Sequence, residues 1–474
     1  MEGIVKGQEL EVTVERLAFG GKGLARVDGL VVFLERALPG QRLRIRIQKK
    51  RSRHAEGRVL SVISQSPGRS EPFCSHFGVC GGCRWQDLAY AEQLHWKREH
   101  ALECLTHLAG LKGVPVDSAV PSPATTFYRN KMEFTFSDRR WLLPEEIEQE
   151  GTCFRRDFAL GLHIPGHFDK VFNVEECFLQ SAASTEILRE VRSWCEKSSL
   201  APYSIRHRNG FWRFLVIREG KRTGQILVHL ITAGRDPFAG EVEALARHLH
   251  ERFSRITTFV HSMSVKQAQV ATGDVTRVVT GPGYIEEILG GLRFRISAHS
   301  FFQTNPLGAE RLYETIAELG DLRGGETLWD LYCGTGSIAM VLASRVRRVV
   351  GFEMVEEAVA DARANCALNG IDNCSFHAGD LKDLMRKGSD PFQYGGRPDL
   401  VVTDPPRAGM HPKVVQTLMD VGPKSIIAVS CNPSTLARDL SLLLEKYTVE
   451  RVLPFDLFPH TPHIECVVKL NRVV

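Results

Sequence analysis

One cysteine and several acidic residues occupy positions where they could take part in chemistry. Cys431 lies in the polar turn Ser430-Cys-Asn-Pro433, and Glu353, Asp380 and Asp404 each follow or end another short apolar run. A thiol in such a place can act as a nucleophile, and carboxylates can accept hydrogen bonds from a ligand. The alternative is that Cys431 is a buried packing residue, which is the usual role of a cysteine.

The elements that would position these residues are five short apolar runs. They cover residues 326–332, 349–353, 374–379, 399–403 and 425–430, and an apolar helix opening at 337–343 follows the first. Such short runs are typical of buried strands. Strands alternating with helices predict an α/β domain with a parallel sheet, and open sheets of this kind bind ligands at the carboxyl ends of their strands.

The turn after the first strand, Cys333-Gly-Thr-Gly336, has two interpretations. Its glycines allow a tight turn and a close approach to a ligand. Gly334-x-Gly336-x-x-Ala339 fits the dinucleotide fingerprint, with Glu353 near the position of the ribose-binding acid. However, Asp330 inside the strand and Asp404-Pro-Pro406 after the fourth strand resemble S-adenosylmethionine (SAM) methyltransferases.

A thiol beside a SAM site suits the methylation of uracil at C5. C5 is a poor nucleophile, but addition of a thiolate to C6 turns C5 into an enolate carbon that can attack a methyl group. A base must then remove the C5 proton so that the thiolate can leave.

Three segments resemble the RNA uracil-5-methyltransferase family: Thr403-Asp-Pro-Pro-Arg-Ala-Gly409, Val429-Ser-Cys-Asn-Pro433 and His463-Ile-Glu-Cys-Val467. The resemblance implies a class I Rossmann-like SAM methyltransferase domain, with Cys431 as the nucleophile and Glu465 as the base. Cys333 is a rival nucleophile, but a residue under the methionine end of SAM cannot also reach C6.

The same resemblance implies a set of cofactor contacts. Ser337 and Asp380 stand where the family often has Asn, and Arg407 replaces the aromatic residue of amino-directed methyltransferases, which favours methylation of carbon. The residues expected to contact SAM are Gln303, Tyr332, Ser337, Glu353, Asp380 and Asp404.

A cysteine cluster, Cys74-x5-Cys80-Gly-Gly-Cys83, could bring three thiolates onto one metal. Zinc, an iron–sulfur cluster and no metal are the alternatives, and the spacing alone would not identify iron, because it differs from the bacterial ferredoxin run. The resemblance supplies Cys177 as the fourth ligand and implies a 4Fe-4S cluster, with Cys153 as a rival ligand.

The N-terminal segment is strongly basic. Residues 1–70 hold fourteen Lys or Arg and seven Asp or Glu, whereas the whole chain has a net charge of only +4. Arg42, Arg44 and Arg46 alternate with apolar residues, so they would share one face of a strand. The segment resembles a TRAM β-barrel, similar to an OB fold, that binds RNA phosphates; the other interpretation is a solvated strand face.

We expect three domains: the TRAM-like barrel at 1–65, a central α+β iron–sulfur domain at 66–290, and the methyltransferase domain at 291–474. By resemblance, a helix at 88–112 packs on the methyltransferase domain. In the central domain, Arg129 and Lys131 of a Tyr-Arg-Asn-Lys motif are expected to share a strand face and meet RNA.

The expected partner is RNA. Ribosomal RNA, 23S in particular, is favoured over transfer RNA, because the barrel and metal site are commoner on the ribosomal branch of the family. We expect a monomer. The absence of a long apolar run and of a signal-peptide pattern, together with twelve cysteines, predicts a cytoplasmic protein. A different class also fits: an iron–sulfur RNA-binding protein that no longer catalyses.

Overall fold

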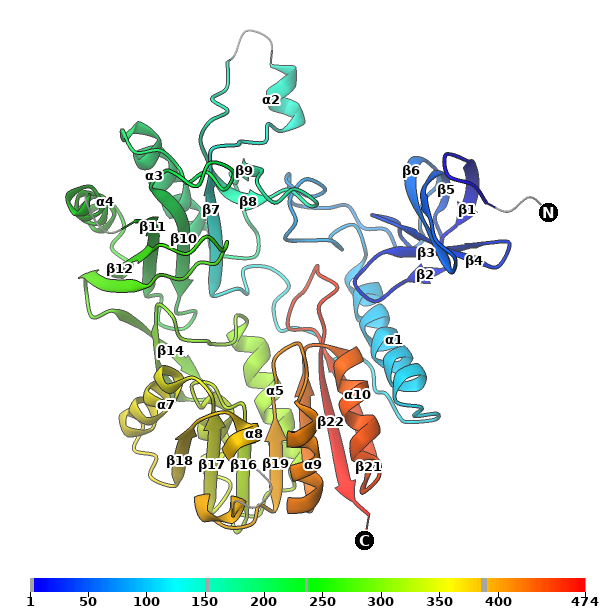
Figure 1. Ribbon diagram of the computed structural model, residues 1–474, viewed down its shortest axis with the longest axis vertical. Coiled ribbons are helices and arrows are strands. Elements are labelled where there is room, and N and C mark those ends of the chain that lie inside the picture. The colour runs from blue at the N-terminus through cyan, green and yellow to red at the C-terminus, as the bar shows by residue number, and fades with distance from the viewer. Residues whose placement is uncertain (1–3, 150–152, 235–237, 385–389, 474) are drawn as a thin grey trace.

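Three large sheets divide the chain into lobes (Figure 1). The computed structural model describes residues 4–149, 153–234, 238–384 and 390–473. A barrel-like N-terminal lobe, a central lobe and a C-terminal lobe meet around the middle of the molecule, so segments far apart in sequence come together there.

The N-terminal lobe is a six-stranded sheet in the order β1-β5-β6-β4-β3-β2. In β5, the side chains of Leu43, Ile45 and Ile47 are buried and the arginines between them are exposed, which confirms the predicted alternation. The strands are β1 (Glu9–Thr13), β2 (Arg16–Leu17), β3 (Gly23–Val27), β4 (Leu30–Leu34), β5 (Arg42–Lys50) and β6 (His54–Ser64).

The central lobe is a seven-stranded sheet whose apolar face is packed against helices α3 (Ala182–Lys197) and α4 (Ala239–Arg252). A short helix, α2 (Pro144–Glu148), lies in the connection that follows β7. The strands are β7 (Lys131–Ser137), β8 (Ala159–His163), β9 (Val171–Asn173), β10 (Trp212–Glu219), β11 (Ile226–Ala233), β12 (Ile256–Ser264) and β13 (Val275–Thr280).

The expectation that Arg129 shares a strand face with Lys131 is wrong, because β7 begins only at Lys131. The backbone turns at Phe127, whose φ is 54°. The segment is held outside the sheet by tertiary bonds instead. The Tyr128 hydroxyl donates to the Pro459 carbonyl at 3.1 Å, and Asn130 Nδ2 donates to the Gln303 carbonyl at 3.0 Å.

A hairpin and one helix connect the central lobe to the last lobe. The hairpin is β14 (Tyr284–Leu289) with β15 (Leu292–Ser297), and the helix is α5 (Pro306–Leu319). Asn305 caps α5, since its side chain accepts a hydrogen bond from the Gly308 amide.

The last lobe is a sheet in the order β18-β17-β16-β19-β20-β22-β21, in which the first five strands are parallel and β22 is antiparallel to both neighbours. The five predicted apolar runs are confirmed as strands, with ends within two residues of those expected. The strands are β16 (Thr327–Leu331), β17 (Arg348–Glu353), β18 (Cys374–Ala378), β19 (Leu400–Thr403), β20 (Ser425–Ser430), β21 (Tyr447–Phe455) and β22 (Glu465–Arg472).

Helices cover both faces of this sheet, as expected for a parallel sheet. On one face the core includes residues of α5, α6 and α7, and on the other residues of α1, α9 and α10. The helices are α1 (Tyr90–Leu108), α6 (Ser337–Ala343), α7 (Glu356–Leu368), α8 (Leu381–Leu384), α9 (Pro412–Val421) and α10 (Pro433–Leu443), with a 3₁₀ turn at Pro391–Tyr394.

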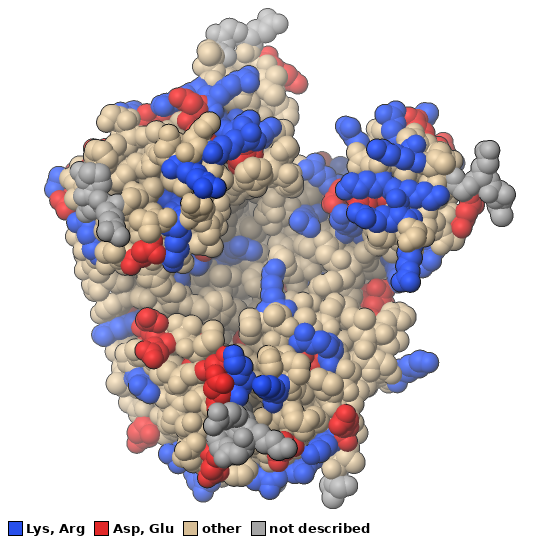
Figure 2. Space-filling view, in the orientation of Figure 1, with Lys and Arg blue, Asp and Glu red and all other residues tan. Residues whose placement is uncertain are grey.

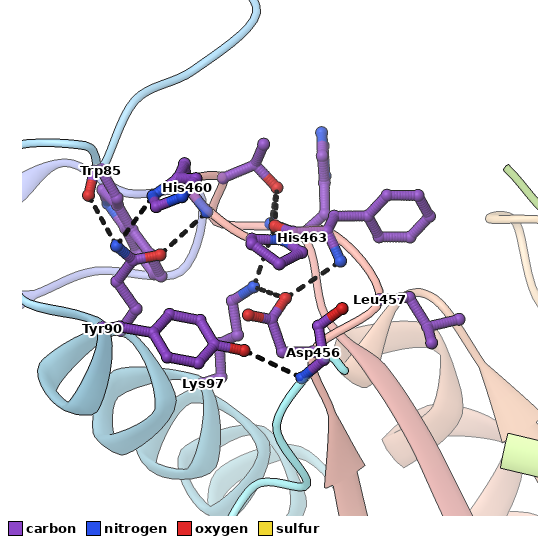
Figure 3. Close-up of polar contacts among 12 residues, drawn as sticks. Trp85, Tyr90, Lys97, Asp456, Leu457, His460 and His463 are labelled. Atoms are coloured by element: carbon purple, nitrogen blue, oxygen red, sulfur yellow. Dashed lines mark hydrogen bonds and ion pairs between the residues drawn. The ribbon is translucent and has the colours of Figure 1, made fainter. Parts of the chain in front are cut away.

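Helix α1 packs on α10 and β21, although in sequence it lies between the barrel and the central sheet. A buried ion pair fixes it there: Lys97 Nζ lies 2.5 Å from Asp456 Oδ1 and donates to the Phe458 carbonyl at 3.2 Å (Figure 3). Gln93 joins the same loop, accepting a hydrogen bond from the His460 amide at 2.8 Å. Within the described ranges, no helix is both long and apolar enough to cross a membrane.

Candidate active site

Polar residues gather at the carboxyl edge of the parallel strands. Tyr332 follows β16, Glu353 ends β17, Asp404 follows β19 and Cys431 follows β20. The Asp404 amide donates to the Leu331 carbonyl at 3.2 Å, so the ends of β16 and β19 are directly joined. The structure therefore brings these predicted residues to one edge of the sheet, the usual ligand site of this architecture.

The glycine turn has a left-handed backbone at both glycines and is closely packed at Gly336. Gly334 and Gly336 have φ values of 53° and 76°, and a Cβ on Gly336 would lie 2.9 Å from the Phe376 ring. Glu353 holds the turn, since its Oε2 accepts a hydrogen bond from the Gly334 amide at 3.0 Å. Asp330 holds the following helix by accepting from the Ala339 amide at 3.1 Å, and burial raises the pKa of Asp330 well above its ordinary value.

The remaining predicted SAM contacts, Ser337, Asp380 and Gln303, already bond to other residues of the protein. Ser337 Oγ is 2.8 Å from the hydroxyl of Tyr313 on α5, so this hydroxyl is already engaged. Asp380 forms an ion pair with Lys382 at 2.7 Å, and hydrogen bonds from Lys382 lower the pKa of Asp380. Gln303 is half-buried and joined to Asn130 through its backbone carbonyl. A glycine turn with a carboxylate beside it, at the carboxyl edge of a parallel sheet, fits an adenosine-containing ligand such as SAM.

Cys431 and Glu465 are neighbours because of strand register. β20 and β22 pair Ser430 with Cys466, so the next residue of β20 and the preceding residue of β22 lie side by side. Glu465 is only 3% exposed, and its Oε1 has no hydrogen-bond partner among the described residues. Sequence spacing alone could not show this adjacency, because the two residues are separated by α10 and β21.

Burial raises the pKa values of the whole cluster, and neighbouring carboxylates add to the shifts of Glu465 and Cys431. Burial, followed by the charge of Asp404, raises the pKa of Glu465 well above its ordinary value. Burial also raises the pKa of Asp404 to about 6 and, with the two carboxylates adding, that of Cys431 to about 11. Arg407 opposes the shift at Cys431, because a nearby cation favours the thiolate.

Cys431 lines a pocket of about 280 Å³ that is formed by the barrel, the cysteine segment and the last lobe. Arg407 lies within 3.3 Å of His463 Nδ1, and burial lowers the pKa of His463 to about 4, so this imidazole is neutral at neutral pH. Figure 2 shows the hollow where the three lobes meet, with Lys and Arg side chains along its edges. The lining also includes Phe19 and Gly20 of the barrel, and Gly81, Gly82 and Arg84 of the cysteine segment.

The four predicted cluster cysteines line one cavity, together with apolar residues such as Phe77, Phe172 and Phe178. Burial raises the pKa of Cys80 and of Cys83 to about 12. The rival ligand Cys153 is exposed and does not line this cavity. In the described ranges no group of three or more His, Cys, Asp or Glu is placed to hold a metal ion. Four thiols around one apolar cavity are the kind of donors that an iron–sulfur cluster takes, and such a cluster is much larger than a single ion, so the cluster stays a prediction.

The basic face of β5 is partly neutralised by the neighbouring strand. Arg42 pairs with Glu11 at 2.8 Å, and Arg44 and Arg46 pair with Glu9 at 2.9 and 2.6 Å. All three arginines are exposed, so this surface remains open to an anionic partner. Phosphate contact by these arginines stays a prediction.

Comparison with known proteins identifies relatives along the whole chain. A family model for tRNA (uracil-5-)-methyltransferases matches residues 247–473, and a TRAM-domain model matches residues 5–60. An uncharacterized RNA methyltransferase of Porphyromonas gingivalis is 42% identical, covering 96% of this chain and 98% of its own length. Another from Nitratidesulfovibrio vulgaris is 39% identical, covering 100% of this chain and 98% of its own length.

One solved structure resembles the chain over nearly its entire length. It is the Pyrococcus abyssi tRNA (uracil-54, C5)-methyltransferase in complex with S-adenosyl-L-homocysteine. The TM-score is 0.74 with 27% sequence identity, and the match covers 97% of this chain and 100% of that chain.

Proposed function

Because this chain belongs to the RNA (uracil-5-)-methyltransferase family and is a SAM-dependent enzyme acting on RNA, we propose that it methylates C5 of one specific uridine through a covalent bond between Cys431 and C6. The observation that carries this proposal is the pairing of a half-buried thiol with the buried, unpartnered carboxylate of Glu465. A nucleophile and a base side by side are what the two halves of the reaction require.

The protein's residues divide the reaction between them. The thiolate of Cys431 adds to C6, and the displaced π electrons make C5 an enolate carbon. SAM supplies the methyl group that C5 takes up. Glu465 then removes the C5 proton, the C5–C6 double bond re-forms, and the thiolate of Cys431 is expelled. Burial makes the Glu465 carboxylate a stronger base than an exposed one, which suits this last step.

The cofactor is proposed to lie along the carboxyl edge of the sheet. Glu353 would accept hydrogen bonds from the ribose hydroxyls, and Asp380 would accept from the adenine amino group. Gln303, Tyr332, Ser337 and Asp404 are proposed as further contacts. Ser337 would have to share its hydroxyl with Tyr313.

Cys74, Cys80, Cys83 and Cys177 are proposed to hold a 4Fe-4S cluster. Anaerobically purified protein should then be brown and contain about four irons per chain. Cys80→Ser should lower the iron content while SAM binding is retained, since the cavity lies outside the SAM edge. Equimolar zinc without visible absorption would contradict the proposal.

The proposed RNA is 23S ribosomal RNA, with transfer RNA as the second candidate. The tRNA enzyme of P. abyssi favours the second candidate, because it aligns over 97% of this chain and so includes the barrel. Mapping which 5-methyluridine disappears from the RNA of a deletion strain distinguishes them.

A covalent trap tests the catalytic proposal. RNA containing 5-fluorouridine should form a stable adduct with the enzyme, because the fluorine at C5 cannot be removed as a proton is. With ordinary RNA, Glu465→Gln should accumulate a methylated protein–RNA adduct that survives denaturation, since addition proceeds and elimination stalls.

The exposed residue Glu445 on the same lobe provides the control. Glu445→Gln should turn over normally and accumulate nothing. A Glu465→Gln enzyme that binds SAM and RNA but turns over at the wild-type rate, or that shows no adduct, would remove Glu465 as the base.

A further inference from the structure

The turn between β2 and β3 of the barrel reaches the pocket that contains Cys431. Its backbone is closed by hydrogen bonds between Ala18 and Lys22 and between Gly21 and Ala18, each of 2.8 Å. Gly21 has a φ of 91°, and a Cβ there would lie 3.1 Å from both Pro462 Cβ and Trp85 Nε1. The turn is therefore packed directly against the loop that precedes Glu465.

Arg84 secures this contact from the cysteine segment. Its Nη1 donates to the Gly20 carbonyl at 3.2 Å, and its backbone amide donates to the His460 carbonyl at 2.9 Å. One residue thus joins the barrel turn to the 456–464 loop. The turn is therefore part of the pocket wall and is bonded to the cysteine segment.

Phe19, at the tip of this turn, is 44% exposed and lines the pocket. Its ring makes a T-shaped contact with His100 at a centroid distance of 6.0 Å. Arg84 and Arg407 line the same pocket. Gly20, Gly81 and Gly82 also line it and place no side chain in it. An exposed aromatic ring in one pocket with two cations suits the stacking of a base of unpaired RNA and the binding of its phosphates.

We propose that Phe19 stacks on the base of a nucleotide adjacent to the target uridine, so that the barrel holds the RNA in place beside the methylation site. The inference rests on the proposed function. The target base itself is held by residues of the methyltransferase lobe, because its C6 must meet Cys431 and its C5 must face Glu465. Phe19 belongs to the wall that the barrel supplies, where the neighbouring nucleotide enters.

Phe238 is a matched control for removing this ring. It is 43% exposed, and its ring also makes a T-shaped contact, with Phe211 at a centroid distance of 5.3 Å. It precedes α4, which lies on the side of the central lobe away from the barrel (Figure 1). Phe19→Ala should raise KM for RNA about tenfold, while SAM binding and the melting temperature stay unchanged. Phe238→Ala should leave KM unchanged, and Phe19→Trp should retain the wild-type value.

Substrates with a single abasic nucleotide identify the stacked base. Removing the base that contacts Phe19 should raise KM of the wild-type enzyme about tenfold and should add nothing in Phe19→Ala. Phe19→Ala that behaves as Phe238→Ala does, or that adds its full loss to every abasic substrate, overturns the inference. A wild-type enzyme without methylation or adduct would instead refute the proposed function.

Discussion

The charged residues on the basic face of β5 and those at the carboxyl edge of the methyltransferase sheet lie in opposite environments. Arg42, Arg44 and Arg46 are exposed and ion-paired, whereas Asp330 and Glu465 are buried and each has a carboxylate oxygen without a partner among the described residues. Exposed pairs contribute at most about 1 kcal/mol, and burial of an acid changes its pKa strongly. The exposed arginines of β5 therefore form a charged surface, whereas the buried carboxylate of Glu465 has a strongly shifted pKa beside the proposed nucleophile.

The largest effect should come from the thiol at the buried edge. Cys431→Ala should reduce methylation by at least about 10⁴-fold and abolish covalent capture of RNA, because the nucleophile is lost. Cys153→Ala, which removes an exposed thiol, should change neither. Mass spectrometry of the reaction with 5-fluorouridine RNA measures both. An adduct that persists in Cys431→Ala would assign the nucleophile to another residue.

Next in size is the buried ion pair beneath the site. Lys97→Met leaves Asp456 buried without its cation, which should lower the free energy of unfolding by about 3–5 kcal/mol. Arg46→Met breaks an exposed pair and should cost less than about 1 kcal/mol. Urea unfolding of the two variants compares them directly. Equal losses would mean that burial does not separate the two regions.

The pH dependence of stability should also differ between a buried acid, Glu465, and an exposed acid. Because the pKa of Glu465 is higher in the folded protein, folding is favoured when this carboxyl is protonated. This contribution to stability is fully present below the pKa of the unfolded chain, about 4.5, and is lost as pH rises through the pKa of the folded protein. At pH 8 folding must either protonate Glu465 or bury its charge, and both destabilise the protein, so Glu465→Gln should melt a few degrees higher than wild type. The difference should shrink towards pH 4.

Glu445→Gln should show no such difference at any pH. Thermal melts between pH 4 and 8 provide the measurement. A wild-type protein that melts above Glu465→Gln at pH 8 would show that the carboxylate is stabilised in the fold by a cation and is not strained by burial.

The smallest effect is expected at the barrel face. Each of Arg42, Arg44 and Arg46 that contacts a phosphate should contribute about 0.7–0.9 to the slope of log K against log salt, and the triple Ala variant should lose that amount. Glu9→Gln should strengthen RNA binding, because it removes the carboxylate that competes for Arg44 and Arg46. An unchanged slope in the triple variant means that the face is only solvated.

Much of this organisation could be read from the sequence, because local patterns determine it. Strand ends at Glu353 and Ser430, and the alternation in β5, follow from runs of apolar residues. Contacts between distant segments have no such local signal. Nothing around Phe19 indicates that it reaches the pocket of Cys431, and the Tyr-Arg-Asn-Lys motif was misassigned to a strand because its bonds to Pro459 and Gln303 are tertiary.

The placement of α1 has a consequence for how the chain can be divided. Its contact with Asp456 joins residues 359 positions apart, and its apolar face is covered by α10 and β21. A recombinant fragment containing only the barrel and the central lobe would expose Ala101 and Leu105 and leave Lys97 without its anion. Because α1 completes the core of the last lobe, we expect the lobes to unfold together, and during synthesis this helix exposes apolar residues until the late strands arrive.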